Sequence, residues 1–373
     1  MERLPLSAPD IRDEDVAAVT AALRSGMLSK GPWTARLEQE FADYVGVPHA
    51  VAVSSGTAGL HLCVRAVGAG DGDEVVTTPF GYVASANSIL YERARPVFAD
   101  IDEASMNLDP AAAAAAITPR TKAVLPVHVF GEPAAMGELV GLCAARRVAL
   151  IEDACEAIGA EHRGRRVGSF GDTAVFSFFP NKQMTTGEGA VITCRDAKTA
   201  RLLRELRNQG QAEDGAPMVH EHVGYNYRMT ELSAALGVTQ LARIEEMLAT
   251  RERLAGLYRE RLAAIPRARL LAPGAATTRL SWFTAIVRLD AELDRAWVID
   301  RLARAGVPAR PYFEPIHLQP VYRRMFGYAP GDFPIAERVA RSTLALPFYN
   351  RMNAAQVDRV CDALAEAVEC VAA

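Results

Sequence analysis

The chain has 373 residues, half of them hydrophobic, so it can bury a large core across two or three domains. Its 41 basic and 45 acidic residues give a net charge of −4, and this near balance gives no reason to expect nucleic acid or an anionic membrane as a partner. The sequence shows neither the apolar segment of a signal peptide nor a run long enough to span a membrane. We therefore expect a cytoplasmic protein.

The cysteines lack the Cys-x-x-Cys spacing of redox and zinc motifs, and most lie in apolar helix or strand patterns. They are Cys63, Cys143, Cys155, Cys194, Cys361 and Cys370. Free, buried thiols in a reducing cytoplasm are the simplest interpretation.

Short β-rich segments alternate with helical patterns between about residues 50 and 195. The predicted strands cover residues 49–53, 74–77, 96–99, 123–127, 148–154, 173–178 and 190–194. Strands that are separated by helices predict a mostly parallel sheet with helices on both faces, so the fold class is α/β. The alanine run 111–116 reads as a helix, because Asp109 and Pro110 supply a cap and a first-turn proline.

A long helical pattern over residues 230–260 predicts the boundary between two domains. Beyond it, a strand at 282–289 and a helix at 297–302 indicate a smaller C-terminal domain, which a helix over 354–371 closes. We therefore place a large domain at residues 1–245 and a small one at 246–373.

Lys182 lies in an apolar, Gly-bounded turn that directly follows a predicted strand. Water-poor surroundings favour the neutral amine, which can attack a carbonyl and form a Schiff base. Lys182 is therefore the candidate covalent residue. For a single lysine near glycines, a solvated surface group is the alternative.

The strand 148–154 is fully apolar until it ends in Glu152 and Asp153, at the edge where a parallel sheet presents its ligand groups. A buried carboxylate is costly unless it meets a cation, and the protonated ring nitrogen of pyridoxal phosphate is such a cation. The alternative for Asp153 is a cap of the next helix.

Residues 49–67 read as a strand, a turn with hydroxyls and a glycine, and the start of a helix. Free backbone N–H groups at Gly56, Thr57 and Ala58, with the positive end of the helix dipole, can hold a phosphate dianion. An ordinary helix cap is the alternative, since Ser and Thr are favoured there in any helix.

Three further patterns receive ordinary interpretations. The glycines of 68–72 follow a helix and precede a strand, the reverse of a dinucleotide-binding loop, so they form a turn. His220 and His222 flank Glu221 without a third ligand at motif spacing, so we expect no metal. His61 lies on an amphipathic helix and is expected to be partly buried.

Together these motifs resemble the DegT/DnrJ/EryC1/StrS family of pyridoxal-phosphate sugar aminotransferases, which have fold type I. The resemblance runs in the family's order over essentially the whole chain. The segments that carry it are 55–58, 78–87, 152–154, 177–189, 224–229, 310–317 and 346–349. It implies a large domain with a mostly parallel seven-stranded sheet between helices, and a smaller C-terminal α+β domain.

The resemblance also implies roles for individual residues. Lys182 would bind the cofactor covalently and move the reacting proton, and Asp153 would keep the pyridine nitrogen protonated. Tyr82 would stack on the ring, unless it is a core aromatic. Gly56, Thr57 and Ser177 would bind the phosphate.

Other matched positions concern the partner subunit and the substrate. Asn226 would reach the phosphate of the neighbouring subunit, which implies a homodimer with a shared active site. Glu156 stands where many relatives place Gln or His against the cofactor's 3′ oxygen, and its role stays open. Tyr312 and His317 are candidate substrate contacts, although His317 could instead pack in its Pro-rich loop. Glu188 reads as a structural acid that binds turn amides, with a substrate contact as the alternative.

The implied reaction moves an amino group from an amino acid, most often L-glutamate in this family, to the keto group of a nucleotide-linked deoxysugar. The chain looks closest to the members that aminate 4-keto-6-deoxy sugars of the perosamine type. Members that act on 3-keto sugars share the motifs, and cyclitol-type and aminobenzoate-forming relatives stay open as alternatives. A dehydratase, in which histidine replaces the lysine, and a non-catalytic binding protein are disfavoured by Lys182 and by the intact set of Thr57, Asp153 and Ser177.

Overall fold

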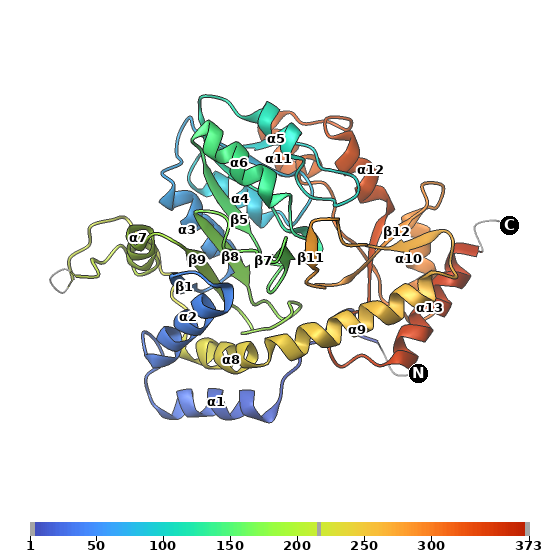
Figure 1. Cartoon of the computed structure of the whole chain (residues 1–373), viewed down its shortest axis with the longest axis horizontal. Helices are drawn as coiled ribbons and strands as arrows, with labels where there is room; N and C mark the ends of the chain where they lie inside the picture. The colour runs from blue at the N-terminus through green and yellow to red at the C-terminus, as the bar shows by residue number, and fades with distance from the viewer. Residues whose placement is uncertain (1–3, 215–217, 370–373) are drawn as a thin grey trace.

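The computed structural model describes residues 4–214 and 218–369, so the predicted thiol Cys370 lies outside the described residues. A seven-stranded sheet has the spatial order β1, β9, β8, β5, β4, β2, β3. Figure 1 labels β1, β9, β8 and β5 of this sheet. Its strands are β1 (His49–Val53), β2 (Glu74–Thr77), β3 (Arg95–Phe98), β4 (Thr121–Leu125), β5 (Ala149–Asp153), β8 (Thr173–Ser177) and β9 (Ala190–Cys194). β9 runs antiparallel to both of its neighbours, β1 and β8, and the other neighbouring strands of this sheet are parallel to each other. The predicted α/β class with a mostly parallel sheet is confirmed.

Helices cover both faces of this sheet. α3, α4 and α7 contribute to the core on one face, and α2, α8, α5 and α6 contribute to the cores on the other. In β1, Ala50 and Ala52 enter the core with α2 and α8, whereas Val51 and Val53 enter the core with α3 and α7, as alternation along a strand requires. The helices are α2 (Pro32–Val45), α3 (Gly56–Ala66), α4 (Ala84–Tyr91), α5 (Pro110–Ala116), α6 (Met136–Arg146), α7 (Ala197–Arg207) and α8 (Glu231–Ala242).

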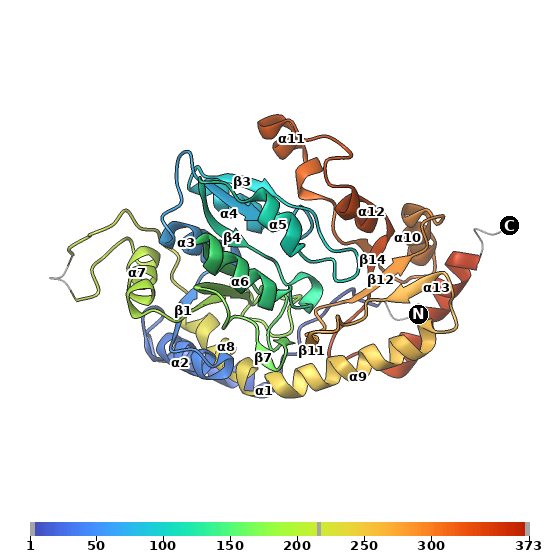
Figure 2. The same ribbon diagram turned by 45° about the horizontal axis from the view of Figure 1, so that its top comes forward.

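The predicted long helix over 230–260 is in fact two helices. Thr230 caps α8, and the backbone at Arg243 leaves helical geometry, with φ −109° and ψ 6°, before α9 (Ile244–Leu262) begins. Helical periodicity continues across this break, so the sequence pattern does not reveal it. α9 then extends from beneath the seven-stranded sheet to the C-terminal part of the chain (Figures 1 and 2). The predicted domain boundary at residue 245 falls in its first turn and stays a prediction.

The C-terminal part is built on an antiparallel four-stranded sheet in the order β10, β12, β14, β13. α9, α10 and α13 share one apolar core with this sheet. The elements are β10 (Ala268–Leu270), β12 (Ala285–Leu289), α10 (Arg295–Arg304), β13 (Arg310–Pro311), η2 (Ile316–Leu318), α11 (Pro320–Phe326), α12 (Pro334–Ser342), β14 (Thr343–Leu346) and α13 (Ala354–Glu369). The predicted strand at 282–289 starts only at Ala285. Residues 281–283, which we call the strap, lead into it without strand geometry.

Smaller elements connect these units. The sequence did not predict α1, η1 or a three-stranded sheet of short strands in the order β11, β6, β7. Their bounds are α1 (Asp13–Arg24), η1 (Val129–Gly131), β6 (Glu161–His162), β7 (Arg165–Arg166) and β11 (Thr277–Arg279). Within the part of the chain that the structure describes, no helix is long and apolar enough to cross a membrane.

Glu103 ties the loop after β3 to the C-terminal part of the chain. Its carboxylate accepts hydrogen bonds from Arg338 on α12 and Arg288 on β12. These two hydrogen bonds lower the pKa of Glu103 to about 2.

Candidate active site

A cavity of about 460 Å³ opens at the carboxyl ends of β5 and β8, where a doubly wound sheet binds its ligands. Most of the predicted site residues line it. They are Gly56, Thr57, Tyr82, Asp153, Glu156, Ser177, Lys182 and Tyr312. Residues that lie far apart in the sequence thus meet in one place, as the predicted site requires.

Asp153 and Glu152 end β5 and have different functions because successive side chains point to opposite faces of the sheet. Glu152 is fully buried and accepts hydrogen bonds from the backbone N–H groups of Gly168, Phe170 and Gly171. Asp153 lines the cavity. Glu152 is therefore a structural acid, and Asp153 is the carboxylate that can meet a ligand.

Ser85 holds the Asp153 carboxylate from α4. Its hydroxyl donates to Asp153 Oδ2 at 2.6 Å, and the backbone N–H of Cys155 donates to Oδ1 at 3.1 Å. Sequence reasoning did not assign Ser85 a role. Its position three residues after Tyr82 was the available signal.

Lys182 lies on the turn after β8, which backbone hydrogen bonds close: its own N–H donates to Phe179 O at 2.9 Å. Only 12% of the side chain is exposed. Its Nζ lies 3.4 Å from Glu156 Oε1 and 4.1 Å from the centroid of the Phe283 ring. The amine is thus held inside the cavity, and not in bulk solvent.

Glu156 is buried between the lysine and the backbone of η1. Its Oε2 accepts the N–H of Phe130 at 2.9 Å. Burial raises the pKa of the Glu156 carboxyl, while the charge of Lys182 opposes that rise. The carboxyl therefore sits beside Lys182 Nζ as a group that can share a proton with it.

The strap carries Phe283 to this lysine. The Ser281 N–H donates to Gly131 O at 3.1 Å, and the side chain of Gln183, the neighbour of Lys182, donates to Ser281 Oγ at 2.7 Å. From α9, the buried Arg251 donates to the carbonyl oxygens of the strap at 3.0 and 3.2 Å. Sequence reasoning missed Phe283, because contacts between segments far apart in the sequence bring its side chain next to Lys182.

The N-terminus of α3 forms another wall of the cavity. Ser55 caps the helix by accepting the Ala58 N–H at 3.1 Å. The N–H groups of Gly56 and Thr57 donate no hydrogen bond to any described residue, so they are open for an anion. The Ala58 N–H is used by this cap, and the predicted phosphate contact through Ala58 stays a prediction. A Cβ on Gly56 would lie 3.1 Å from Ser177 Cβ, so the cradle fits only glycine without rearrangement.

Two aromatic residues, Tyr82 and Tyr312, line the cavity. Tyr82 is 63% exposed, so it is not a core aromatic. Tyr312 stacks on Phe313, with ring centroids 4.9 Å apart. The stacking of Tyr82 on a cofactor ring stays a prediction.

Two predicted residues do not reach this cavity. His317 is fully buried, and its Nε2 lies 3.1 Å from Glu337 Oε1, so it packs against α12 and does not line the cavity. Asn226 is exposed and pairs through its backbone with Asn208. Its side chain is therefore available to another molecule, and not to the cavity of its own chain.

Glu188 differs from the expectation of a structural acid. It is exposed and lines the cavity, and its carboxylate makes no hydrogen bond or ion pair with a described residue. The turn is instead closed by hydroxyl groups, such as Thr186 Oγ1 donating to the Glu188 carbonyl oxygen at 2.8 Å.

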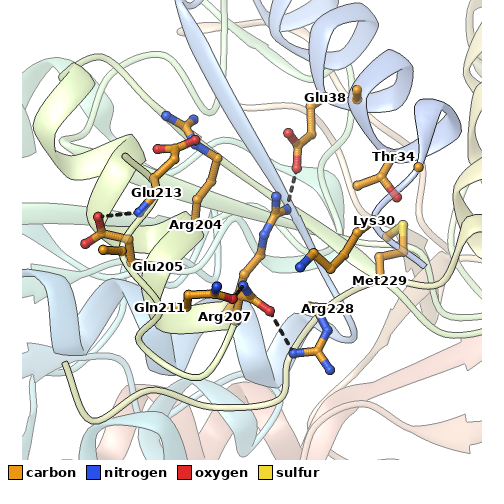
Figure 3. Close-up of a pocket in the computed structure, with 14 residues that line it drawn as sticks. Lys30, Thr34, Glu38, Arg204, Glu205, Arg207, Gln211, Glu213, Arg228 and Met229 are labelled. Carbon is orange, nitrogen blue, oxygen red and sulfur yellow. Dashed lines mark hydrogen bonds and ion pairs between the residues drawn. The ribbon is translucent and has the colours of Figure 1, made fainter. Parts of the chain in front are cut away.

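A second cavity, of about 380 Å³, lies between α2 and α7 (Figure 3). Lys30, Arg207 and Arg228 line it, and Arg207 forms an ion pair with Glu38. It contains none of the predicted site residues.

The histidine-rich segment after α7 brings three possible metal ligands together. Glu205, Glu221 and His222 each place one ligand atom within 4.8 Å of the others. Glu221 and His222 are exposed, and Glu205 already accepts a hydrogen bond from Arg201 at 2.9 Å. This arrangement is an exposed charged cluster, and we assign it no metal.

Comparisons with known proteins agree with this geometry. A model of the DegT/DnrJ/EryC1/StrS aminotransferase family matches residues 9–365. The GDP-perosamine synthase of Caulobacter vibrioides is 40% identical over 98% of both chains. The spore coat polysaccharide biosynthesis protein SpsC of Bacillus subtilis is 38% identical over 98% of this chain and 97% of the relative.

Solved structures agree as well. DesV of S. venezuelae superimposes with a TM-score of 0.92, at 35% identity over 98% of both chains. The PLP form of the putative sugar aminotransferase Spr1654 of Streptococcus pneumoniae gives a TM-score of 0.94, at 27% identity over 99% of this chain and all of that one. The predicted family, fold type and cofactor are confirmed. The chain belongs to the DegT/DnrJ/EryC1/StrS aminotransferase family and is a pyridoxal-phosphate-dependent enzyme.

Proposed function

We propose that the protein moves an amino group from an amino acid, L-glutamate, to the keto carbon of a nucleotide-linked 4-keto-6-deoxysugar. The observation that carries this proposal is the meeting of Lys182, Asp153 and the open N-terminus of α3 in one cavity. The sugar class rests on the likeness to a GDP-perosamine synthase over 98% of both chains.

The residues of the cavity fit pyridoxal phosphate. The open N–H groups of Gly56 and Thr57 suit its phosphate, and the Asp153 carboxylate suits its protonated ring nitrogen. When bound, the cofactor supplies an aldehyde and an electron-accepting ring.

The protein's own groups then divide the work. Lys182 Nζ binds the cofactor and carries the reacting proton, with the Glu156 carboxyl 3.4 Å away to share it. Asp153, which Ser85 holds in place, keeps a proton on the ring nitrogen. Phe283 covers the lysine and limits the access of water.

Transfer of labelled nitrogen tests this proposal. The purified enzyme is given L-glutamate with an isotopically labelled amino group and a panel of nucleotide-linked 4-keto and 3-keto sugars, and the products are analysed by mass spectrometry. We expect label in the sugar product and the highest rate with a 4-keto-6-deoxy sugar. Label in 3-keto products alone would contradict the sugar assignment. A product that has lost oxygen without gaining nitrogen would indicate a dehydratase, and no product at all would indicate a binding protein.

We also propose a homodimer in which Asn226 completes the partner's active site. Its exposure, away from the cavity of its own chain, supports this arrangement. A mixture of Lys182→Ala and Asn226→Ala subunits tests it, because a mixed dimer whose Asn226 acts across the interface has one site that keeps both residues. We expect the mixture to regain activity that neither variant shows alone. No recovery in a mixture shown to form mixed dimers would contradict the proposal.

A cytoplasmic location is part of the same proposal. The cysteines of the described chain, Cys63, Cys143, Cys155, Cys194 and Cys361, are all free. Free thiols suit a reducing compartment. Localisation of the tagged protein by cell fractionation checks this expectation.

A further inference from the structure

Arg310 stands out because it is a cation at the active-site cavity that has no partner among the described residues. It opens β13, the edge strand of the four-stranded sheet, through pairing with Ala345 on β14. Lys182 and Arg310 are the cationic side chains among the described residues that line the cavity. The Arg310 guanidinium is exposed and forms no ion pair or hydrogen bond with a described residue, including Glu188, the exposed carboxylate of the same cavity.

The other positively charged groups of the cavity already have neighbours or an expected ligand. Lys182 lies against Glu156 and Phe283. The open N–H groups of α3 suit the cofactor phosphate. Arg310 therefore remains as the cation of the cavity with no assigned partner.

Arg310 is an exposed part of the cavity wall. It lines the cavity together with Tyr312, two residues further along the chain, and with the exposed Tyr82. Burial raises the pKa of Tyr312, and the charge of Arg310 opposes that rise, which places the guanidinium within electrostatic reach of the phenol.

Both substrates of the proposed reaction are anions. The amino-acid donor carries carboxylates, and the sugar carries a nucleoside diphosphate. A guanidinium binds either group with two parallel hydrogen bonds, which a lysine or an amide cannot reproduce. Because one cavity must accept the two substrates in turn, one exposed arginine in its wall, unpaired among the described residues, can serve both.

We propose that Arg310 is the substrate-anion residue of this active site and binds the donor carboxylate, the diphosphate of the sugar nucleotide, or each in turn. This inference rests on the proposed function for the identity of the two substrates. The anion chemistry itself is testable without any turnover.

The test measures binding to the PLP-loaded enzyme by isothermal titration calorimetry. The probes are inorganic pyrophosphate for the diphosphate and glutarate for the donor carboxylates. The variants are Arg310→Gln, which removes the charge, and Arg310→Lys, which keeps the charge but not the planar fork. Arg269→Gln is the matched control, because Arg269 is exposed and lies on β10 at the opposite edge of the same sheet.

We expect Arg310→Gln to weaken the binding of at least one probe by about ten- to a hundredfold, as the loss of a charged hydrogen-bonding pair does. Arg310→Lys should weaken it less, and Arg269→Gln should leave it unchanged. Loss for pyrophosphate alone assigns the diphosphate, loss for glutarate alone assigns the donor carboxylate, and loss for both assigns both.

Unchanged affinities in Arg310→Gln, or an equal loss in Arg269→Gln, would overturn the inference. The thermal unfolding temperature and PLP content of each variant show that it is folded and loaded. The titrations measure binding and do not depend on nitrogen transfer. A failure of this inference can therefore be distinguished from a failure of the proposed function.

Discussion

Gly131 is the position at which the packing of the active site can be tested by a single methyl group. Its φ is +89°, in the left-handed region, and a Cβ there would lie 1.6 Å from the carbonyl oxygen of Ser281 and 3.1 Å from that of Glu156. Both atoms belong to the backbone, so neither can rotate away. Gly131→Ala must therefore displace the strap that carries Phe283 to Lys182.

The cost follows from the contacts that the displacement breaks. A residue with a Cβ in left-handed geometry costs about 1–2 kcal/mol. The hydrogen bond from the Ser281 N–H to Gly131 O and the one from Gln183 Nε2 to the Ser281 carbonyl oxygen contribute about 0.5–1.5 kcal/mol each. We expect Gly131→Ala to lower the free energy of unfolding by about 3 kcal/mol.

Urea unfolding, followed by tryptophan fluorescence, measures this change. The matched control is Gly141→Ala, because Gly141 is exposed within α6 and its added Cβ would meet nothing within 4 Å. A helix interior favours alanine, so the control should gain about 0.5–1 kcal/mol. If the unfolding free energy of Gly131→Ala remained within about 0.5 kcal/mol of that of the unaltered protein, the close packing of the strap against Gly131 would be refuted.

Three more outcomes are expected. Glu103→Gln should lower the free energy of unfolding at neutral pH by less than about 1 kcal/mol, because the ion pairs of Glu103 with Arg288 and Arg338 are exposed to solvent. Glu103 has a pKa of about 2 in the folded protein, against 4.5 ordinarily. The difference in unfolding free energy between the unaltered protein and Glu103→Gln should therefore shrink as pH falls from 4.5 towards 2. A difference in urea unfolding that stays constant over this range would contradict the expectation. Gly56→Ala should reduce the affinity of the apoprotein for PLP about tenfold, because the added Cβ crowds the phosphate cradle at the start of α3. Absorbance titration measures this affinity. An unchanged affinity would show that the phosphate does not bind at this end of the helix. Ser85→Ala should also weaken PLP binding, by about tenfold, because Asp153 loses its 2.6 Å donor, and an unaltered dissociation constant would show that Ser85 does not position Asp153.

The sequence predicts the sheet and the covalent residue because both are encoded locally. β-rich segments separated by helical patterns define the parallel strands, and Asp153 follows from the apolar strand that it ends. Lys182 follows from the turn after β8. Side chains alternate along β5, so Asp153 faces the cavity and Glu152 is buried on the other face. The sequence indicates that the two acids point in opposite directions, but only the folded sheet shows which of them faces the cavity.

Contacts between distant segments account for what the sequence did not predict. Phe283 and Arg310 reach the cavity from the strap and β13, and no local pattern marks them as neighbours of Lys182. Ser85 contacts Asp153 from α4, and only its spacing from Tyr82 hints at this role. His317 shows the reverse, since a residue in a motif-rich loop packs against Glu337 instead of the cavity.

Chemical mapping of the cofactor tests the central claim most directly. The PLP-loaded protein is reduced with borohydride and digested, and mass spectrometry locates the pyridoxyl group among the peptides. We predict that it lies on Lys182 and that Lys182→Ala carries none. A pyridoxyl group on Lys30, Lys122 or Lys198, or its persistence in Lys182→Ala, would contradict the account.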